Sequence, residues 1–266
     1  MDLYLIRLFL ILFVSHSFAY GSTALHDRIE YHSRMLLGQP YGHSPLGEGS
    51  GYDSDPLIRF DLFDCTTYVE TVLALSISDI HGVNRAPVEI LNSIRYKFAN
   101  SEIAFVNRAH FTSADWIPNL VAKKMIEDIT VELFEELSVN EVTDIDRQGW
   151  FQHSHQMQVP SAKQIVLLPV VELKEFTKNS RLWDLIPSGA LINFVGHSDT
   201  IKEKTGTEMD VAHQGIAIRR VGQLFLRHAK SPSRGVVEEH ITDAFKNPYL
   251  IHAKSINVLR PIGPAR

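Results

Sequence analysis

The sequence predicts an α+β fold. Segments with helical spacing of apolar residues dominate the first half of the chain, and strand-like segments dominate the second half. Helices and strands do not alternate singly, as they would in βαβ units around a parallel sheet. We therefore expect helices and strands to be largely segregated along the chain.

The composition is that of one soluble globular domain. Of the 266 residues, 44% are hydrophobic and 21% are charged, which is an ordinary balance for a folded protein. The formal net charge is -5, and no basic stripe with interleaved aromatic residues is evident. We therefore expect no nucleic-acid partner.

The N-terminus predicts export. Leu3 to Val14 is apolar apart from Arg7, and the next five residues end at Ala19 in a small-x-small cleavage pattern. The apolar run is shorter than the roughly 20 residues that span a bilayer, and no cysteine follows that could accept a lipid. We expect a signal peptide over residues 1–19, a single catalytic domain over 20–266, and no stable membrane anchor.

The next segments predict a helix followed by a long loop. The helix is expected from Thr23 to Leu37, and Gly38-Gln39-Pro40 ends it. Tyr41 to Pro56 is crowded with glycine, serine and proline. A loop of this length in a compact domain is usually functional or disordered. Its position before the only cysteine favours a substrate-binding wall.

Cys65 is the only cysteine, so it cannot form an intramolecular disulfide. Asp64 is a suitable N-cap, and the apolar residues that follow have helical spacing. Cys65 would then occupy the first helical turn, where the positive helix end favours a thiolate nucleophile. A buried, unreactive cysteine remains an equal alternative on this local context.

Two more helices are expected after the Cys65 helix and before the strands begin. Asn84 and Pro87 start the first of these, and its buried side ends at Phe98. Residues 105–118 combine polar and aromatic side chains without periodicity, so they either line a pocket or form a surface loop. A short helix from Pro118 to about Met125 follows.

Six segments have strand character, and the last of them closes the chain. They are Ile129–Phe134, Gln164–Val171, Ala190–Val195, Val211–Arg219, Gln223–Ala229 and Ser255–Leu259. The fourth and fifth predict a hairpin, because a tight connection containing Gly222 separates them.

The hairpin suggests a pair of histidines. If its loop is centred between Arg220 and Val221, His213 lies directly opposite His228, and one imidazole can orient the other. An odd loop would place the two histidines on opposite faces. We expect the start of the Cys65 helix to approach the face of His213, Gly215 and Ala217, because Gly215 and Ala217 are small. Two unrelated histidines remain the alternative.

Ordered motifs carry a resemblance to a known family. Asp64–Thr67, followed by His213–Ile216 and Arg227–Ala229, resembles the Cys/His/His pattern of the NlpC/P60 cysteine peptidases of cell-wall turnover. The motifs that resemble the DUF1460 family of N-acetylmuramoyl-L-alanine amidases are Pro45–Gly49, Asp61–Glu70, Arg108–Trp116, Ile186–Gly189 and Leu226–Ala229. Ala190 stands where relatives commonly carry Asp, which concerns a turn hydrogen bond rather than the chemistry.

The resemblance implies a fold and a reaction. The fold is a papain-like NlpC/P60 core, in which an antiparallel sheet or half-barrel packs on the helix that carries the cysteine. Cys65 is implied as the nucleophile, His213 as general base and later acid, and His228 as the group that orients His213. The implied reaction is hydrolysis of the MurNAc–L-Ala amide bond in peptidoglycan fragments or cell wall, without cofactor or metal. We expect a periplasmic or secreted monomer.

The same resemblance implies a set of substrate-binding residues. They are Leu46, Gly47, Glu48, Asp64, Arg108, His110, Asp115 and Trp116.

Several other functions remain open. The same three residues would serve a γ-D-glutamyl-diamino acid endopeptidase, or a thiol acyltransferase in which a nucleophile other than water accepts the acyl group. Zinc catalysis is another alternative, with His153-Ser154-His155 or His197-Ser198-Asp199 as the candidate ligands, although neither has the spacing of a familiar catalytic site. A non-enzymatic wall-binding module with a structural Cys65 is the last alternative.

Overall fold

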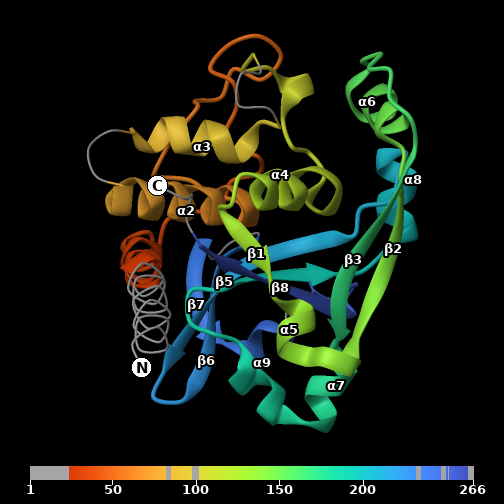
Figure 1. The fold of residues 1–266 in the computed structure, drawn as a ribbon. Helices are drawn as coiled ribbons and strands as arrows, with labels where there is room; N and C mark the ends of the chain where they lie inside the picture. The colour runs from red at the N-terminus through yellow and green to blue at the C-terminus, as the bar shows by residue number, and fades with distance from the viewer. Residues whose placement is uncertain are drawn as a thin grey trace, which may run out of the picture.

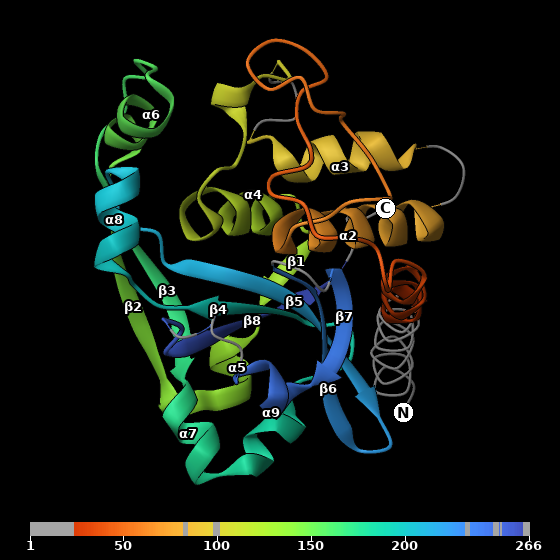
Figure 2. The same cartoon turned by 180° about the vertical axis from the view of Figure 1, so that it is seen from behind.

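A computed structural model describes residues 24–81, 85–97, 102–231, 235–246, 250 and 252–262. The expected signal peptide lies outside these residues, as do Thr23, Asn84 and Phe98. Figures 1 and 2 show the sheet between two groups of helices. In the part that the structure describes, every helix is too short or too polar to cross a membrane.

Eight strands of the described residues form one antiparallel sheet. Their order is β2-β3-β8-β4-β5-β6-β7, and β1 pairs with β8. Their bounds are β1 Ile126–Asp128, β2 Ser138–Ile145, β3 Gln164–Glu172, β4 Leu191–Val195, β5 Val211–Arg220, β6 Gln223–Lys230, β7 Gly235–His240 and β8 Ser255–Pro261.

Three helices lie on one side of this sheet (Figure 1): α2 Cys65–His81, α3 Pro87–Arg95 and α4 Ile117–Ala122. Residues 24–35 form a further helix. The other described helices are α5 Thr130–Phe134, α6 Arg147–His155, α7 Leu173–Lys178, α8 Asp199–Thr205 and α9 Ile241–Ala244. A turn of π-helix, Thr112–Trp116, precedes α4. The predicted α+β class is thus confirmed, although the short helices intervene between strands.

The predicted strand from Ile129 to Phe134 is wrong. The strand is β1, which ends at Asp128, and Thr130 begins α5. An Asp128 Oδ1 oxygen accepts a hydrogen bond from the backbone N–H of Thr130 at 2.9 Å, which favours a turn at this point. The buried Thr130 hydroxyl then receives the backbone N–H of Val258 at 2.9 Å. These tertiary contacts outweigh the β propensity of the segment.

Two apolar cores lie on opposite faces of the sheet, because side chains alternate along each strand. Ile216 and Ile218 pack in the same core as the apolar side of α2, whereas Ala217 belongs to the other core. The body of α2 therefore packs on the Ile216 and Ile218 face, not on the face of Gly215 and Ala217, and only the Cys65 thiol at its start reaches the backbone of β5, at Gln214. A Cβ at Gly215 would lie 2.6 Å from Leu226 Cδ1, so Leu226 fills the space that the small residue leaves.

A buried row of amides crosses the centre of the sheet. Gln214 Nε2 donates to Asn193 Oδ1 at 2.8 Å, and Asn193 Nδ2 donates to Asn257 Oδ1 at 2.9 Å. Asn257 Nδ2 donates to Asp128 Oδ2 at 2.7 Å. Because the carboxylate only accepts, each amide has a defined orientation, and the row ties Gln214 of β5 to β4, β8 and β1.

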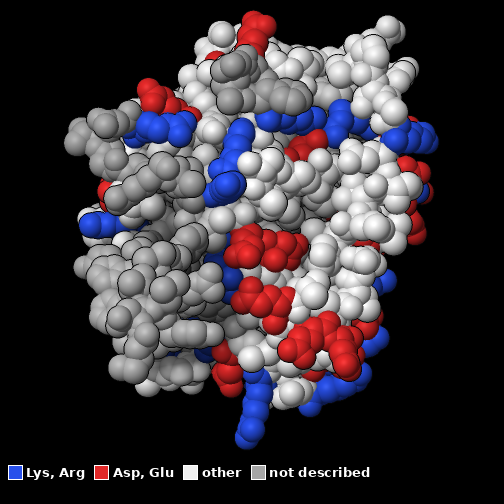
Figure 3. Space-filling model, in the orientation of Figure 1, with Lys and Arg blue, Asp and Glu red and all other residues white. Residues whose placement is uncertain are grey.

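The face shown in Figure 3 is acidic over β1 and α5. Arg260 pairs there with Glu127 and Glu132. This part of the surface repels rather than attracts polyanions.

The β5–β6 hairpin has a two-residue loop of Val221 and Gly222, one residue further along than predicted. Arg220 pairs with Gln223 and Ile216 with Arg227, so that extending this register places His213 opposite Lys230 rather than His228. The loop length remains even, which keeps both histidines on one face. They meet as diagonal neighbours across the two strands.

Replacing Val221 with asparagine will stabilise the protein. Val221 is fully exposed and has a φ of 48°, and Gly222 has a φ of 77°, as in a type I′ turn. A β-branched residue is strained in this region, whereas asparagine tolerates it, so we expect a gain of about 1 kcal/mol in the free energy of unfolding. Urea denaturation measures this gain. Gly222→Ala is the matched control and should destabilise; a loss of stability in Val221→Asn would contradict the assignment.

Candidate active site

Asp64 caps α2 and links it to the preceding loop. Its Oδ1 accepts hydrogen bonds from the backbone N–H of Thr67 at 2.8 Å and from the Thr67 hydroxyl at 2.7 Å. Its Oδ2 accepts the backbone N–H of Ser44 at 3.0 Å. The predicted N-cap is confirmed. Cys65 is therefore the first residue of α2.

The thiol of Cys65 is half-buried between α2 and β5. A backbone hydrogen bond from Gln214 reaches the sulfur, and the Thr66 hydroxyl lies 3.9 Å from it. Burial, together with the Asp64 carboxylate, raises the pKa of the thiol to about 12. The expected lowering of this pKa is wrong, because burial and the capping carboxylate outweigh the hydrogen bonds and the helix end.

His213 and His228 begin a chain of polar groups that crosses three strands. His213 Nε2 lies 2.6 Å from His228 Nδ1, and His228 is fully buried. His228 Nε2 donates to Glu239 Oε1 of β7 at 2.9 Å. Lys230 Nζ donates to both oxygens of Glu239, at 2.9 and 2.7 Å. Gln214, which contacts the thiol, directly follows His213 in β5.

The charges in this chain favour a neutral His213. Burial lowers the pKa of His213 well below 6.5, and a protonated His228 and the charge of Lys230 act in the same direction, whereas Glu239 opposes them. The hydrogen bonds from His228 and Lys230 lower the pKa of Glu239 to about 2. Glu239 is therefore the fixed negative charge of the chain.

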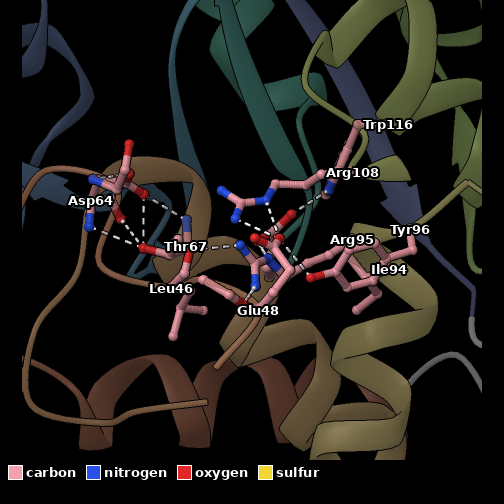
Figure 4. A network of polar contacts seen from close by, with 12 residues as sticks. Leu46, Glu48, Asp64, Thr67, Ile94, Arg95, Tyr96, Arg108 and Trp116 are labelled. Atoms are coloured by element: carbon pink, nitrogen blue, oxygen red, sulfur yellow. Dashed lines mark hydrogen bonds and ion pairs between the residues drawn. The ribbon is translucent and has the colours of Figure 1, made fainter. Parts of the chain in front are cut away.

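Glu48, in the loop before α2, forms an ion pair with Arg108, which lies beyond α3 in the chain (Figure 4). Arg108 Nε and Nη2 donate to Glu48 Oε1 at 2.9 and 2.6 Å, and Nη2 also donates to Asp53 Oδ2 at 2.8 Å. The hydroxyl of Tyr96 donates to the same Glu48 oxygen at 2.9 Å. The structure thus brings two predicted binding residues together, each with polar partners from the protein itself.

Arg95 holds the loop from the other side. Its guanidinium donates to the carbonyls of Leu46 and Gly47 at 2.8 and 3.1 Å, and its Nε lies 3.4 Å from Glu70 Oε2. Trp116 Nε1 donates to Glu70 Oε1 at 3.0 Å. Leu46 and Trp116 are buried, so their side chains pack inside the protein rather than at its surface.

His110 and Asp115 contact neighbouring segments of the protein. His110 Nε2 bonds to the carbonyl of Phe105 at 2.6 Å. Asp115 accepts two hydrogen bonds from Arg147 of α6, at 2.6 and 2.7 Å, and Lys97 lies 3.0 Å from it. The segment that contains them is ordered by a buried Phe111 and Trp116, so it is not a loop confined to the surface.

Comparison of this chain with known protein families identifies the family to which it belongs. The model of the AmiA-like family, described as N-acetylmuramoyl-L-alanine amidase-like, matches residues 31–250. The chain belongs to this family. No curated protein matches it.

Solved structures share the fold of this AmiA-like chain. Protein LPG0564 from Legionella pneumophila str. Philadelphia 1, described by the family DUF1460, is 26% identical, with a TM-score of 0.80 over 94% of this chain and 96% of that one. An N-acetylmuramoyl-L-alanine amidase from Bacteroides uniformis ATCC 8492 is 22% identical, with a TM-score of 0.64 over 91% and 99%. A putative xylanase from Bacteroides fragilis is 22% identical, with a TM-score of 0.62 over 86% and 99%.

The histidines considered as zinc ligands lie in other contacts of this AmiA-like chain. His155 Nδ1 lies 3.0 Å from the hydroxyl of Tyr52, and His197 Nε2 lies 2.8 Å from Glu141 Oε1. Among the described residues, no three or more His, Cys, Asp or Glu side chains lie close enough to hold a metal ion.

Sequence analysis missed Glu239, Lys230 and Arg95. Glu239 lies on β7, which was not predicted, and the only local signal for that strand is the β-branched pair Val236-Val237 before it. The contacts of Arg95 join segments that are distant in the chain, and no local pattern encodes them.

Replacing Glu70 with glutamine will remove a pH-dependent loss of stability. Burial raises the pKa of Glu70 from 4.5 to about 7. Between these values the folded state binds more protons than the unfolded state, so the free energy of unfolding falls as the pH rises. We expect Glu70→Gln to gain stability relative to the native protein across this window and then to level off.

Urea denaturation at a series of pH values measures the difference between the two proteins. Glu89→Gln changes an exposed carboxylate on α3 and is the matched control, with a nearly constant difference. A constant difference for Glu70→Gln up to about pH 8 would contradict the raised pKa.

Proposed function

We propose that this protein is a cysteine-dependent amidase that cleaves the MurNAc–L-Ala bond of peptidoglycan fragments. The carrying observation is that the Cys65 thiol contacts the backbone of Gln214, directly after His213, while His213 contacts His228. Membership of the AmiA-like family supports an amide substrate of this class. We interpret the packing of α2 on β5 and β6 as the papain-like NlpC/P60 core.

In this proposal the two histidines divide the work. His228 holds Nε2 of His213, so Nδ1 of His213 is the nitrogen that we assign to receive the thiol proton. Since the pKa of Cys65 is raised and that of His213 is lowered, the resting forms are a neutral thiol and a neutral imidazole. His213 therefore acts as a general base rather than as the partner of a preformed thiolate.

The reaction proceeds through an acyl-enzyme. His213 Nδ1 takes the thiol proton as sulfur attacks the lactyl carbonyl carbon, and the carbonyl electrons move to oxygen near the backbone N–H of Cys65. The C–N bond breaks, and His213 gives its proton to the nitrogen of L-Ala. Water then attacks the thioester and gives a proton to His213, and the released sulfur regains that proton.

The loop before α2 and the Arg108–Trp116 segment supply the substrate wall. Glu48 and Arg108 form its ion pair, Asp64 caps α2 beside it, and His110 lies two residues after Arg108 in the chain. Leu46, Gly47, Asp115 and Trp116 support it, since their contacts are to other parts of the protein. Action in the periplasm or outside the cell follows from the expected signal peptide.

Cys65→Ala will abolish hydrolysis. We expect a fall of at least about 10³-fold in rate, because the nucleophile is removed. Mass spectrometry of defined muropeptides, including anhydro forms, identifies the products: free disaccharide and an intact stem peptide for the native protein. Denaturation curves of both proteins exclude misfolding.

Each other product would replace the proposal by a defined alternative. Cleavage within the stem would indicate a γ-D-glutamyl endopeptidase, and transfer to an added amine would indicate an acyltransferase. Full activity of Cys65→Ala would exclude the thiol mechanism, and binding without cleavage would indicate a wall-binding module. Inhibition by a chelator alone would favour zinc chemistry.

Alkylation of Cys65 by iodoacetamide will accelerate with pH well beyond neutrality. The raised thiol pKa leaves little thiolate near pH 7, and the thiolate is the reactive form. The rate constant, read by mass spectrometry on the single cysteine, should still be rising near pH 10. Glutathione, whose thiol is free in solution, is the reference for the rate. A variant such as Gln214→Pro does not serve, because it would distort β5 as well as remove the backbone donor. A plateau below neutral pH would instead indicate a thiolate–imidazolium pair.

A further inference from the structure

Glu239 completes a directional chain of hydrogen bonds. A carboxylate can only accept, so the 2.9 Å contact requires a proton on Nε2 of His228. In neutral His228 the other nitrogen, Nδ1, is then an acceptor. The 2.6 Å contact consequently requires a proton on Nε2 of His213.

This chain decides which nitrogen of His213 can act as a base. With the proton on Nε2, Nδ1 carries the lone pair. The opposite tautomer of His213 would place a proton on Nδ1 and could not accept the proton of a thiol. The geometry points to Glu239 as a positioning residue, because it selects the His228 tautomer and thereby the active tautomer of His213. This inference rests on the proposed function of Cys65 and His213.

Glu239 also faces the charge that forms during the reaction. When Nδ1 of His213 takes the thiol proton, the ring becomes an imidazolium, while His228 and Glu239 keep their protonation states. The negative charge of Glu239 stabilises that imidazolium through His228. The proton then leaves for the amine of the departing stem peptide, so no net proton is stored in the chain.

The groups around the histidines come from three strands. β5 carries His213, β6 carries His228 and Lys230, and β7 carries Glu239. β4 contributes the uncharged ring of Phe194, 5.8 Å from that of His213. Lys230 holds both oxygens of Glu239, so it keeps the carboxylate in place while its positive charge opposes protonation of His213.

Glu239→Gln tests the role directly. Its amide can donate as well as accept, so the His228 tautomer is no longer imposed. We expect kcat/KM on a muropeptide to fall about 10- to 100-fold, less than the roughly 10⁴-fold for a carboxylate that contacts the base itself. The fall should lie in kcat, with KM little changed. Glu238→Gln, which removes the neighbouring β7 carboxylate that pairs with Arg227 and Arg220, is the matched control.

Two further readouts separate positioning from a structural role. Nitrogen-15 NMR of the full protein should show protonated Nε2 on both histidines in the native form, and mixed tautomers in Glu239→Gln. The acid limb of the profile of kcat/KM against pH reports the pKa of His213. This limb should move to lower pH in Glu239→Gln and to higher pH in Lys230→Met. These opposite shifts follow from the opposite charges removed.

The outcomes are distinguishable from failure of the proposed function. If Cys65→Ala stays active, the function is wrong, yet the NMR tautomers of the histidines still report on Glu239. If Cys65→Ala is inactive and Glu239→Gln matches Glu238→Gln in rate, pH profile and tautomers, the role of Glu239 is overturned. Rescue by Glu239→Asp of the native tautomers and most of the rate would support it.

Discussion

The pairing of β5 with β6 is the constraint on which the candidate site depends. An even, two-residue loop keeps His213 and His228 on one face, and their contact at 2.6 Å is a diagonal one. The ladder runs from Arg220 and Gln223 to Ile216 and Arg227, and the thiol meets the backbone of Gln214 just beyond that end. Cys65 therefore approaches the sheet where β5 can offer a backbone donor to another group.

The buried amide row explains how that donor is held. The Gln214 side chain is linked through Asn193 and Asn257 to Asp128, so β4, β8 and β1 together hold this segment of β5 in place. Around it, burial rather than the helix end determines the protonation of Cys65. Asp64 contributes to this result, because the carboxylate that caps α2 also disfavours a nearby thiolate. The proposed mechanism then requires a base, and His213, in contact with His228, is the group proposed to supply it.

Local patterns predicted the elements that have strong local signals. The cap at Asp64 and the strand over Gln164–Val171 were predicted from spacing and turn residues, whereas the parity of the hairpin loop was left open. The helix at Thr130 was not, because a side chain–backbone contact and the distant Val258 decide it. The thiol pKa was missed for the same reason: burial is a property of the assembled fold. Glu239 required β7, whose strand signal is short.

Tertiary contacts fix the position of the loop before α2, although it has no regular local structure. Its glycines and prolines predict only an irregular path, but Arg95 holds the carbonyls of Leu46 and Gly47 while its Nε faces Glu70 on α2. One buried guanidinium thus fixes the loop relative to the helix that carries Cys65. Because burial raises the pKa of Glu70 to about 7, the charge that Arg95 meets changes near neutral pH. The position of this loop and the protonation of Glu70 are therefore linked through the Arg95–Glu70 ion pair.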